Sequence, residues 1–167
     1  YAQFSPCTYT VNYYTGSTKL GSSTHTYDVS ANFSTFSSFS GATIPSGWSS
    51  FAGWTRTSTS NTKDSSQAAY NETTTCGGSI NVYAVFSRTV KFRTAYGSSN
   101  DVSKTQYYNP KNTNPGSVTT PTIASKTDWS IVGYNSSTSG TTSQCGSNTS
   151  CTPSATQYYA VYSNEIS

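Results

Sequence analysis

Four cysteines are the residues of this chain most able to do covalent chemistry: Cys7, Cys76, Cys145 and Cys151. In a short chain that is rich in Ser and Thr and poor in charge, cysteines usually form disulfides in an oxidising compartment. A zinc site would need cysteines and histidines in tight sets, and the single His25 is far in sequence from Cys145 and Cys151. We therefore expect disulfides and no metal site, and four cysteines allow three pairings.

The remaining side chains offer few of the residue patterns that hydrolytic enzymes use. His25 lies in a Ser/Thr-rich stretch and Asp28 follows it closely, so a Ser/His/Asp set can be drawn. However, the chain has no Gly-x-Ser-x-Gly turn, which presents the nucleophilic Ser in many hydrolases. Paired carboxylates would have to converge from acidic residues that are isolated in sequence. These are Asp28, Asp64, Glu72, Asp101, Asp128 and Glu165. We expect that the chain is not an enzyme and that it binds no cofactor.

Four Asn-x-Ser/Thr triplets are candidate sites of N-glycosylation, at Asn32, Asn71, Asn135 and Asn148. A chain this rich in Asn, Ser and Thr also produces such triplets by chance, so their use depends on the organism. Intramolecular isopeptide or ester bonds, which some surface stalk proteins contain, need a buried Lys or Thr beside a carboxylic acid. The sequence locates no such trio, so both kinds of modification stay open.

The composition limits which elements can position these residues. Hydrophobic residues make up 32% of the chain and charged residues 9%, both below the usual share for a globular domain, but aromatic residues reach 14%. Aromatic rings bury large areas, so they can replace the missing aliphatic side chains in a core. The basic residues are scattered, with one cluster at Arg88, Lys91 and Arg93, which is too sparse for a nucleic-acid site.

Targeting features are few. No apolar run approaches the roughly 18 residues that a membrane-spanning helix needs, so we expect no membrane insertion in this segment. The chain starts at Tyr1 and contains no Met, and we expect that a signal peptide has been removed.

Three segments recur in the same order at a spacing of about 80 residues, and such self-similarity is typical of repeated modules. The matching segments are 10–13 with 89–92, 51–54 with 131–134, and 82–86 with 158–162. The recurrence predicts two copies of one module, 1–87 and 88–167.

Each copy is expected to consist of strands and turns. Residues in 9–14, 80–86, 90–94 and 157–162 alternate with period two, which is typical of half-buried strands. Long polar loops are expected over 55–66 and 135–150, where Ser, Thr, Asn and Gly dominate.

One short helix is predicted over 29–39. There Phe33, Phe36 and Phe39 recur at three-residue spacing, and Asp28 can cap the first turn. Prolines leave little room for an equivalent helix in the second copy. The expected fold class is therefore mainly β, with at most one short helix.

The repeated motifs can be compared with a known family. The first copy carries Val11, Tyr13, Phe51, Gly53, Trp54, Tyr83, Ala84 and Phe86, and the second carries Val90, Phe92, Gly133, Tyr134, Tyr159, Ala160 and Tyr162. This order of an opening strand, a central Phe-x-Gly-Trp and a closing Tyr-Ala-x-aromatic strand resembles the Listeria–Bacteroides repeat, the internalin-type B-repeat of cell-surface proteins. The resemblance covers most of 9–163. The chain departs from the family pattern where Phe86 and Tyr162 replace the usual closing Trp, and in having cysteines.

The resemblance implies two tandem β-grasp-like modules, in which the opening and closing strands lie side by side and parallel. The implied core is Phe51, Gly53, Trp54, Tyr83, Phe86, Gly133, Tyr134, Tyr159 and Tyr162. Gly53 and Gly133 stand between bulky neighbours, where a glycine usually marks a bulge or a close backbone approach. Cys7 and Cys76 would lie near one end of such a strand pair, so the resemblance favours Cys7–Cys76 and Cys145–Cys151 as disulfides.

The function expected is that of an extracellular structural or adhesive module at the cell surface, either a stalk or an interaction repeat. One alternative is the subunit of an extracellular filament, in which 1–8 adds as a strand to a neighbour's sheet edge and 163–167 accepts a partner. The other is a carbohydrate-binding module that uses Trp48, Trp129 or exposed Tyr rings. The expected partners are copies of the same chain, other surface proteins or a polysaccharide, and no nucleic acid.

Overall fold

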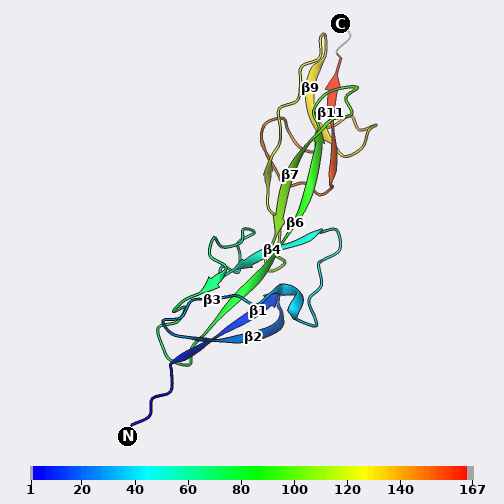
Figure 1. The fold of residues 1–167 in the computed structure, drawn as a ribbon. Helices are drawn as coiled ribbons and strands as arrows, with labels where there is room; N and C mark the ends of the chain where they lie inside the picture. The colour runs from blue at the N-terminus through cyan, green and yellow to red at the C-terminus, as the bar shows by residue number, and fades with distance from the viewer. Residues whose placement is uncertain (1, 165–167) are drawn as a thin grey trace. The chain divides into compact units, whose positions relative to one another are not determined.

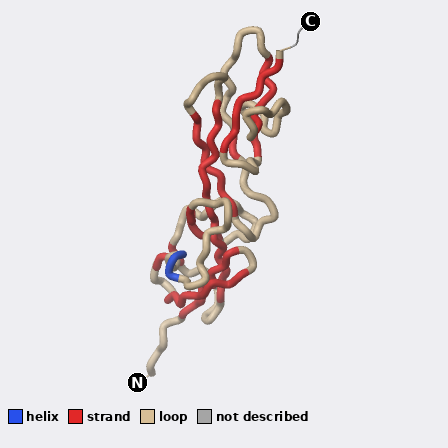
Figure 2. Tube along the Cα trace, turned by 90° about the vertical axis from the view of Figure 1, so that its right-hand side faces the viewer, coloured by secondary structure: helices blue, strands red, loops and turns tan. Residues whose placement is uncertain are grey.

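The computed structural model describes residues 2–164, and in that part of the chain the fold is mainly β, as predicted. The strands are β1 (Thr8–Thr15), β2 (Thr18–Thr26), β3 (Ala31–Asn32), β4 (Ser50–Thr55), β5 (Ala68–Ala69), β6 (Ser79–Arg93), β7 (Asp101–Tyr108), β8 (Val118–Thr119), β9 (Ser130–Asn135), β10 (Ser150–Cys151) and β11 (Gln157–Ser163). Figure 2 shows how much of the chain is loop, and the single blue segment is the 3₁₀ turn η1 (Phe36–Ser38).

The chain divides into two compact units. The first comprises Tyr1–Ser87 and Tyr107–Pro115, and the second comprises Arg88–Gln106 and Gly116–Ser167. The long strand β6 therefore gives its first residues to one unit and its last residues to the other (Figure 1). The segment 107–115, expected in the second copy, lies with the first unit.

Side-chain amides explain why this segment belongs to the first unit. The Asn109 Nδ2 donates to the carbonyl oxygens of Ser58 and Ser60, both at 3.0 Å, and Asn61 accepts from the Asn109 backbone N–H at 2.9 Å. Asn109 is fully buried, so these bonds satisfy its polar atoms. Tyr108 also packs on Trp48, with ring centroids 5.1 Å apart.

The first unit is a sheet in the order β2-β1-β6-β4. β1 is antiparallel to β2 and parallel to β6, with Thr10 opposite Ser79 and Tyr14 opposite Tyr83. β4 is antiparallel to β6, with Phe51 opposite Phe86. Alternation sends one face of each strand inward, and the buried cluster includes Val11, Tyr13, Trp54, Val82, Ala84 and Phe86.

The second unit is a sheet in the order β7-β6-β11-β9. β11 is parallel to the last part of β6, with Gln157 opposite Lys91, and antiparallel to β9, with Ala160 opposite Tyr134. Its buried cluster includes Val90, Phe92, Val118, Ile123, Tyr134 and Tyr158. In both units, therefore, an opening strand and a closing strand are parallel neighbours, and a third strand pairs antiparallel with the closing strand.

The predicted helix over 29–39 is wrong. β3 occupies Ala31–Asn32 and pairs with β5, and only Phe36–Ser38 turns, as a 3₁₀ turn that starts after Thr35. The three-residue spacing of the Phe rings fits this tight turn and a core contact rather than a helix face. The backbone of residues 31–32 pairs with β5 and is therefore extended, not helical. Asp28 has a positive φ of 61° and caps no helix.

Two aromatic residues expected in the core lie on the opposite face of their strands. Tyr83 and Tyr159 are half-buried, because the inward positions of β6 and β11 are those of Val82 and Tyr158. Tyr83 packs on Tyr14 at 5.6 Å between ring centroids. Both segments are strands, as their period-two alternation predicts, but the repeated Tyr-Ala motif does not place its Tyr inside.

Candidate functional site

Two disulfides connect the chain in the pairing that the resemblance implies. Cys7 is bonded to Cys76, with Cα atoms 5.4 Å apart, and Cys145 to Cys151, with Cα atoms 5.6 Å apart. Cys7 and Cys76 have the same sequence separation as the ladder partners Thr10 and Ser79. The two cysteines therefore lie in the same parallel register as β1 and β6. It stands at the end of the strand pair where the chain enters the first unit.

The second disulfide has another role. Cys145 is buried, and its backbone carbonyl accepts from the Tyr134 N–H at 2.6 Å. Cys151 belongs to β10, which pairs with β8. The bond therefore ties the long loop after β9 to the small sheet beside it, and the loop covers β9 along its edge.

A bulge with a glycine is found in the edge strand that pairs antiparallel with the closing strand of each unit, β4 in the first and β9 in the second. In β4 the register skips Ala52 between Phe51 and Gly53, and in β9 it skips Val132 before Gly133. Both glycines have positive φ, 154° for Gly53 and 145° for Gly133, a conformation that side chains disfavour. A Cβ at Gly133 would lie 2.2 Å from the Ser143 Oγ, so the neighbouring loop can approach only a glycine.

The groups that pack on these bulges differ between the units. In the first unit the Gln67 side chain acts like a strand partner, since its Oε1 accepts from the Trp54 N–H at 2.7 Å and its Nε2 donates to the Trp54 carbonyl at 2.9 Å. In the second unit the backbone of Gln144 and Cys145 pairs with Tyr134 in the same way. The Gln67 side-chain amide in the first unit therefore makes the two hydrogen bonds that the backbone of the loop containing Cys145 makes in the second unit.

Tyr134 lies below the second bulge and is fully buried. Its hydroxyl donates to the Pro121 carbonyl at 2.7 Å. Burial is the main cause that raises the pKa of Tyr134 to about 12, with a smaller contribution from Tyr162. The Tyr134 hydroxyl is therefore protonated at any physiological pH. The side chain packs in the core, and the hydrogen bond to Pro121 fixes its hydroxyl.

Arg56 gathers two carboxylates that are isolated in sequence. Its guanidinium contacts Asp64 at 2.8 Å and Glu72 at 2.7 and 2.8 Å, and it donates further to the carbonyls of Ser66 and Ala68. The guanidinium also lies over the Phe33 ring, 4.7 Å from the centroid. The hydrogen bond from Arg56 is the main cause that lowers the pKa of Glu72. Every donor of Arg56 has a partner, so this network orders the 56–72 loop.

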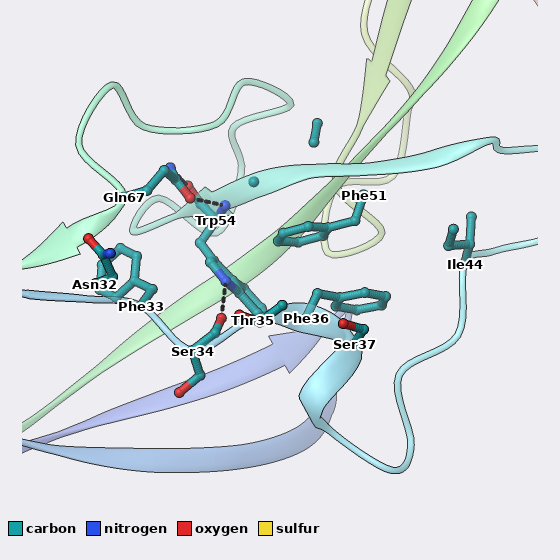
Figure 3. A pocket seen from close by; sticks show the side chains of 12 residues that line it. Asn32, Phe33, Ser34, Thr35, Phe36, Ser37, Ile44, Phe51, Trp54 and Gln67 are labelled. Carbon is teal, nitrogen blue, oxygen red and sulfur yellow. Dashed lines mark hydrogen bonds between the residues drawn. The ribbon is translucent and has the colours of Figure 1, made fainter.

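An aromatic pocket of about 600 Å³ opens in the first unit between β4, the turn η1 and the segment 32–35. Figure 3 shows the rings of Phe36 and Phe51 side by side; they are stacked, with centroids 4.7 Å apart. Trp54 lies between Phe33 at one end and the Phe36/Phe51 pair, and Ile44 lies at the other end (Figure 3). The volume is within the range of ligand sites in proteins.

The polar groups of this pocket are uncharged and mostly occupied. The Trp54 indole N–H donates to the Ser34 carbonyl at 3.0 Å, and the Gln67 amide is used by the bulge. Asn32, Thr35 and Ser37 contribute exposed polar atoms at the rim. The pocket therefore suits an apolar or aromatic group brought by an uncharged segment.

The Ser/His/Asp set does not assemble. His25 is buried, its Nε2 contacts the Ser23 Oγ at 2.7 Å, and that oxygen also contacts the Tyr13 hydroxyl at 2.7 Å. The Asp28 carboxylate is instead held by the Asn71 amide at 2.9 Å. Burial lowers the pKa of His25, and its ring stacks on Tyr9. Among the described residues, His25 therefore contacts Ser23 and Tyr9 and has no hydrogen bond to a carboxylate that would orient the imidazole.

The two tryptophans considered for sugar binding have other neighbours. Trp48 is half-buried against Tyr108. Trp129 is 39% exposed, but the Lys126 ammonium lies 4.0 Å from its ring centroid and 3.6 Å from that of Tyr96. A sugar that stacks on the inner faces of these rings would have to displace the ammonium.

The candidate glycosylation sites differ in accessibility. Asn32 and Asn148 are exposed. Asn71 is half-buried and bonded to Asp28. Asn135 is buried, and its Nδ2 donates to the Thr142 carbonyl at 3.0 Å, so the folded chain cannot present it to a transferase.

Among residues 2–164, no group of three or more His, Cys, Asp or Glu side chains lies close enough to hold a metal ion. Within the same residues, no helix is long and apolar enough to cross a membrane.

Sequence reasoning missed Gln67 and the Arg56 network. The isolated spacing of Asp64 and Glu72 concealed their convergence, because a loop fold, and not a periodic element, brings them together. In a chain with so few charges, an Arg followed by two acidic residues in one polar loop is the signal that could have found them.

Comparison with protein-family models, with curated protein sequences and with solved structures gives no match to the chain. The family resemblance therefore rests on the motif residues themselves.

Proposed function

We propose that the chain is an extracellular structural module of a cell-surface protein, which carries tension as part of a stalk or adhesive repeat. The observation that carries this proposal is that β6 and β11, the first and last strands of the second unit, are parallel neighbours. Tension applied to the two ends of a unit pulls such strands in opposite directions along their length. All the hydrogen bonds of the ladder then share the load, whereas strands that separate from one end break their bonds one after another.

The Cys7–Cys76 bond supports the same proposal. Tension that arrives at Cys7 can pass through the disulfide to Cys76 and directly into β6, so the intervening residues 8–75 carry none of it. Disulfides form and persist in oxidising compartments, which agrees with an extracellular location. The motif resemblance to cell-surface repeats points in the same direction.

The second unit offers the sharper test, because its disulfide does not bypass its parallel strand pair. Click-reactive residues at Thr89 and Ser163 would load the pair of β6 and β11 from opposite ends. Residues at Thr89 and Thr156 would load it from one end, since the Lys91 N–H donates to the Thr156 carbonyl there. All three attachment sites are exposed.

We expect a rupture force several-fold higher for the Thr89/Ser163 attachment than for Thr89/Thr156 in single-molecule pulling. Equal rupture forces for the two attachments would contradict a load-bearing role of the parallel strand pair.

A further inference from the structure

The segment before β1 presents one large apolar side chain to solvent. Phe4 is 90% exposed, the highest exposure among the large hydrophobic residues of the described chain. Residues 2–7 belong to no strand, and the neighbours Gln3 and Ser5 are uncharged. Burial of an exposed apolar side chain is energetically favourable, so binding of this segment to an apolar surface would be stabilised.

The aromatic pocket has the matching properties. Its volume of about 600 Å³ can contain a benzyl group together with adjoining backbone, and its walls are the rings of Phe36, Phe51 and Trp54. Phe36 and Phe51 are stacked on each other and Trp54 is buried, so an incoming phenylalanine would pack against the outer edges of these rings, in offset or edge-to-face geometry, and not between them. None of the residues that line the pocket is charged, and the Lys63 side chain packs beside one of them, Gly53.

Phe4 cannot reach the pocket of its own chain. Phe51 is opposite Phe86 and Trp54 is opposite Ala84, whereas β1 pairs with β6 near Ser79, so these walls of the pocket lie roughly 17–23 Å along β6 from Ser79. Cys7 is bonded to Cys76, beyond Ser79 on the far side from the pocket. Phe4 is three residues from Cys7 and reaches at most about 11 Å from it. Phe4 can therefore enter this pocket only on another molecule.

We propose that the segment 2–6 of one copy inserts Phe4 into the aromatic pocket of a second copy. The contact is heterologous, since a tail on one molecule meets a pocket on the next, and such contacts continue from copy to copy unless the arrangement closes into a ring. This inference goes beyond the mechanical proposal and depends on none of its parts, because it involves only Phe4 and the first unit.

Two variants separate the donor from the acceptor. Phe4→Ser removes the inserting ring, and Phe4 makes no core contact that its loss would disturb. Ser37→Trp puts a bulky ring in the mouth of the pocket from an exposed position of η1, so the fold is retained. Tyr96→Ser, an equally drastic change at an exposed ring of the second unit, is the matched control.

Sedimentation velocity of the full chain at concentrations up to about 1 mM is the test. Wild type and Tyr96→Ser are expected to form oligomers that grow with concentration, and each of the other two variants alone is expected to stay monomeric. A mixture of Phe4→Ser with Ser37→Trp has one intact tail and one intact pocket per pair, so it should form dimers and nothing larger. A monomeric wild type, oligomers that persist in Phe4→Ser, or a mixture that stays monomeric would each overturn the proposal.

Discussion

The backbone at positions 53 and 133 lies where a side chain has no room, and the consequence can be measured. Gly133→Ala should lower the free energy of unfolding by about 2–4 kcal/mol, since the new Cβ adds a clash with the backbone to the strain of positive φ, and Gly53→Ala should lower it by less, since the flexible Lys63 side chain can move away. At Gly53 the Cβ would lie 2.7 Å from the Lys63 Cδ, and at Gly133 it would lie 2.7 Å from the Cys145 carbonyl oxygen.

Gly77→Ala is the control for these two variants. Gly77 has a φ of 81°, but no heavy atom lies within 4 Å of the added Cβ, so only the backbone strain of about 1 kcal/mol should appear in urea denaturation. Equal losses for all three variants would show that the close approach of the loops has no part in stability.

Glu72 should make the stability of the first unit depend on acid. Its pKa in the folded chain is below the usual 4.5, because Arg56 donates to it. A lowered pKa contributes stability that is present above pH 4.5 and is lost as the pH falls through the folded value. Glu72→Gln should cost about 2 kcal/mol at pH 7 and should flatten the loss of stability between pH 5 and pH 2.

Chemical denaturation across this pH range measures the effect. Asp128→Asn is the matched control, because Asp128 is exposed, and its positive φ of 65° is one that Asn tolerates. An acid-dependent loss that is unchanged in Glu72→Gln would contradict the role given to this carboxylate.

Some of the residues that shape the fold could be predicted from sequence patterns, and others could not. Gly53 and Gly133 stand out because a glycine between bulky strand residues usually marks a bulge, and both lie at bulges. Gln67 carries no such signal, since a Gln in a polar loop is unremarkable until its amide is seen on the Trp54 backbone. Convergence through irregular loops depends on three-dimensional closure that local spacing does not encode.

Among the elements, the two disulfides should contribute unequally. By the chain-entropy relation, a loop with the sequence separation of 69 closed by Cys7–Cys76 gains about 4 kcal/mol, and the separation of 6 closed by Cys145–Cys151 gains about 2 kcal/mol. Replacing each pair by Ala should lower the free energy of unfolding in this order.

The short loop provides a second, separable readout. Because Cys145 covers Gly133, the loss of Cys145–Cys151 should increase amide hydrogen exchange at Tyr134, whereas the loss of Cys7–Cys76 should leave exchange there unchanged. A larger destabilisation from the Cys145/Cys151 replacement would contradict the entropic ranking.

Strands are more predictable from the sequence than their partners are. Period-two alternation locates β1, β6 and β11, because side-chain direction along a strand is a local property. The helix expected over 29–39 is wrong because the same Phe spacing also suits a 3₁₀ turn packed on a core. The return of 107–115 to the first unit depends on Asn109 and its partners in the 58–61 loop, which no periodicity indicates.

For the whole molecule, the proposed path of tension runs along covalent bonds and parallel ladders. It enters at Cys7, crosses to Cys76, follows β6 and leaves the second unit through β11. Residues 8–75 lie off this path, so the first unit should keep its length under load while the second unit can still be extended. Asymmetry of this kind would let one unit resist stretching and the other yield.

Contour length in a single-molecule pulling experiment on the chain held at both ends tests this path most directly. The oxidised chain should show only the extension of the second unit, and the Cys7→Ser/Cys76→Ser variant should show an additional extension of roughly 240 Å, from the separation of 69 residues between the two cysteines. An oxidised chain that already releases this additional length would contradict the account, because the Cys7–Cys76 bond that keeps residues 8–75 off the path of tension would then not be formed.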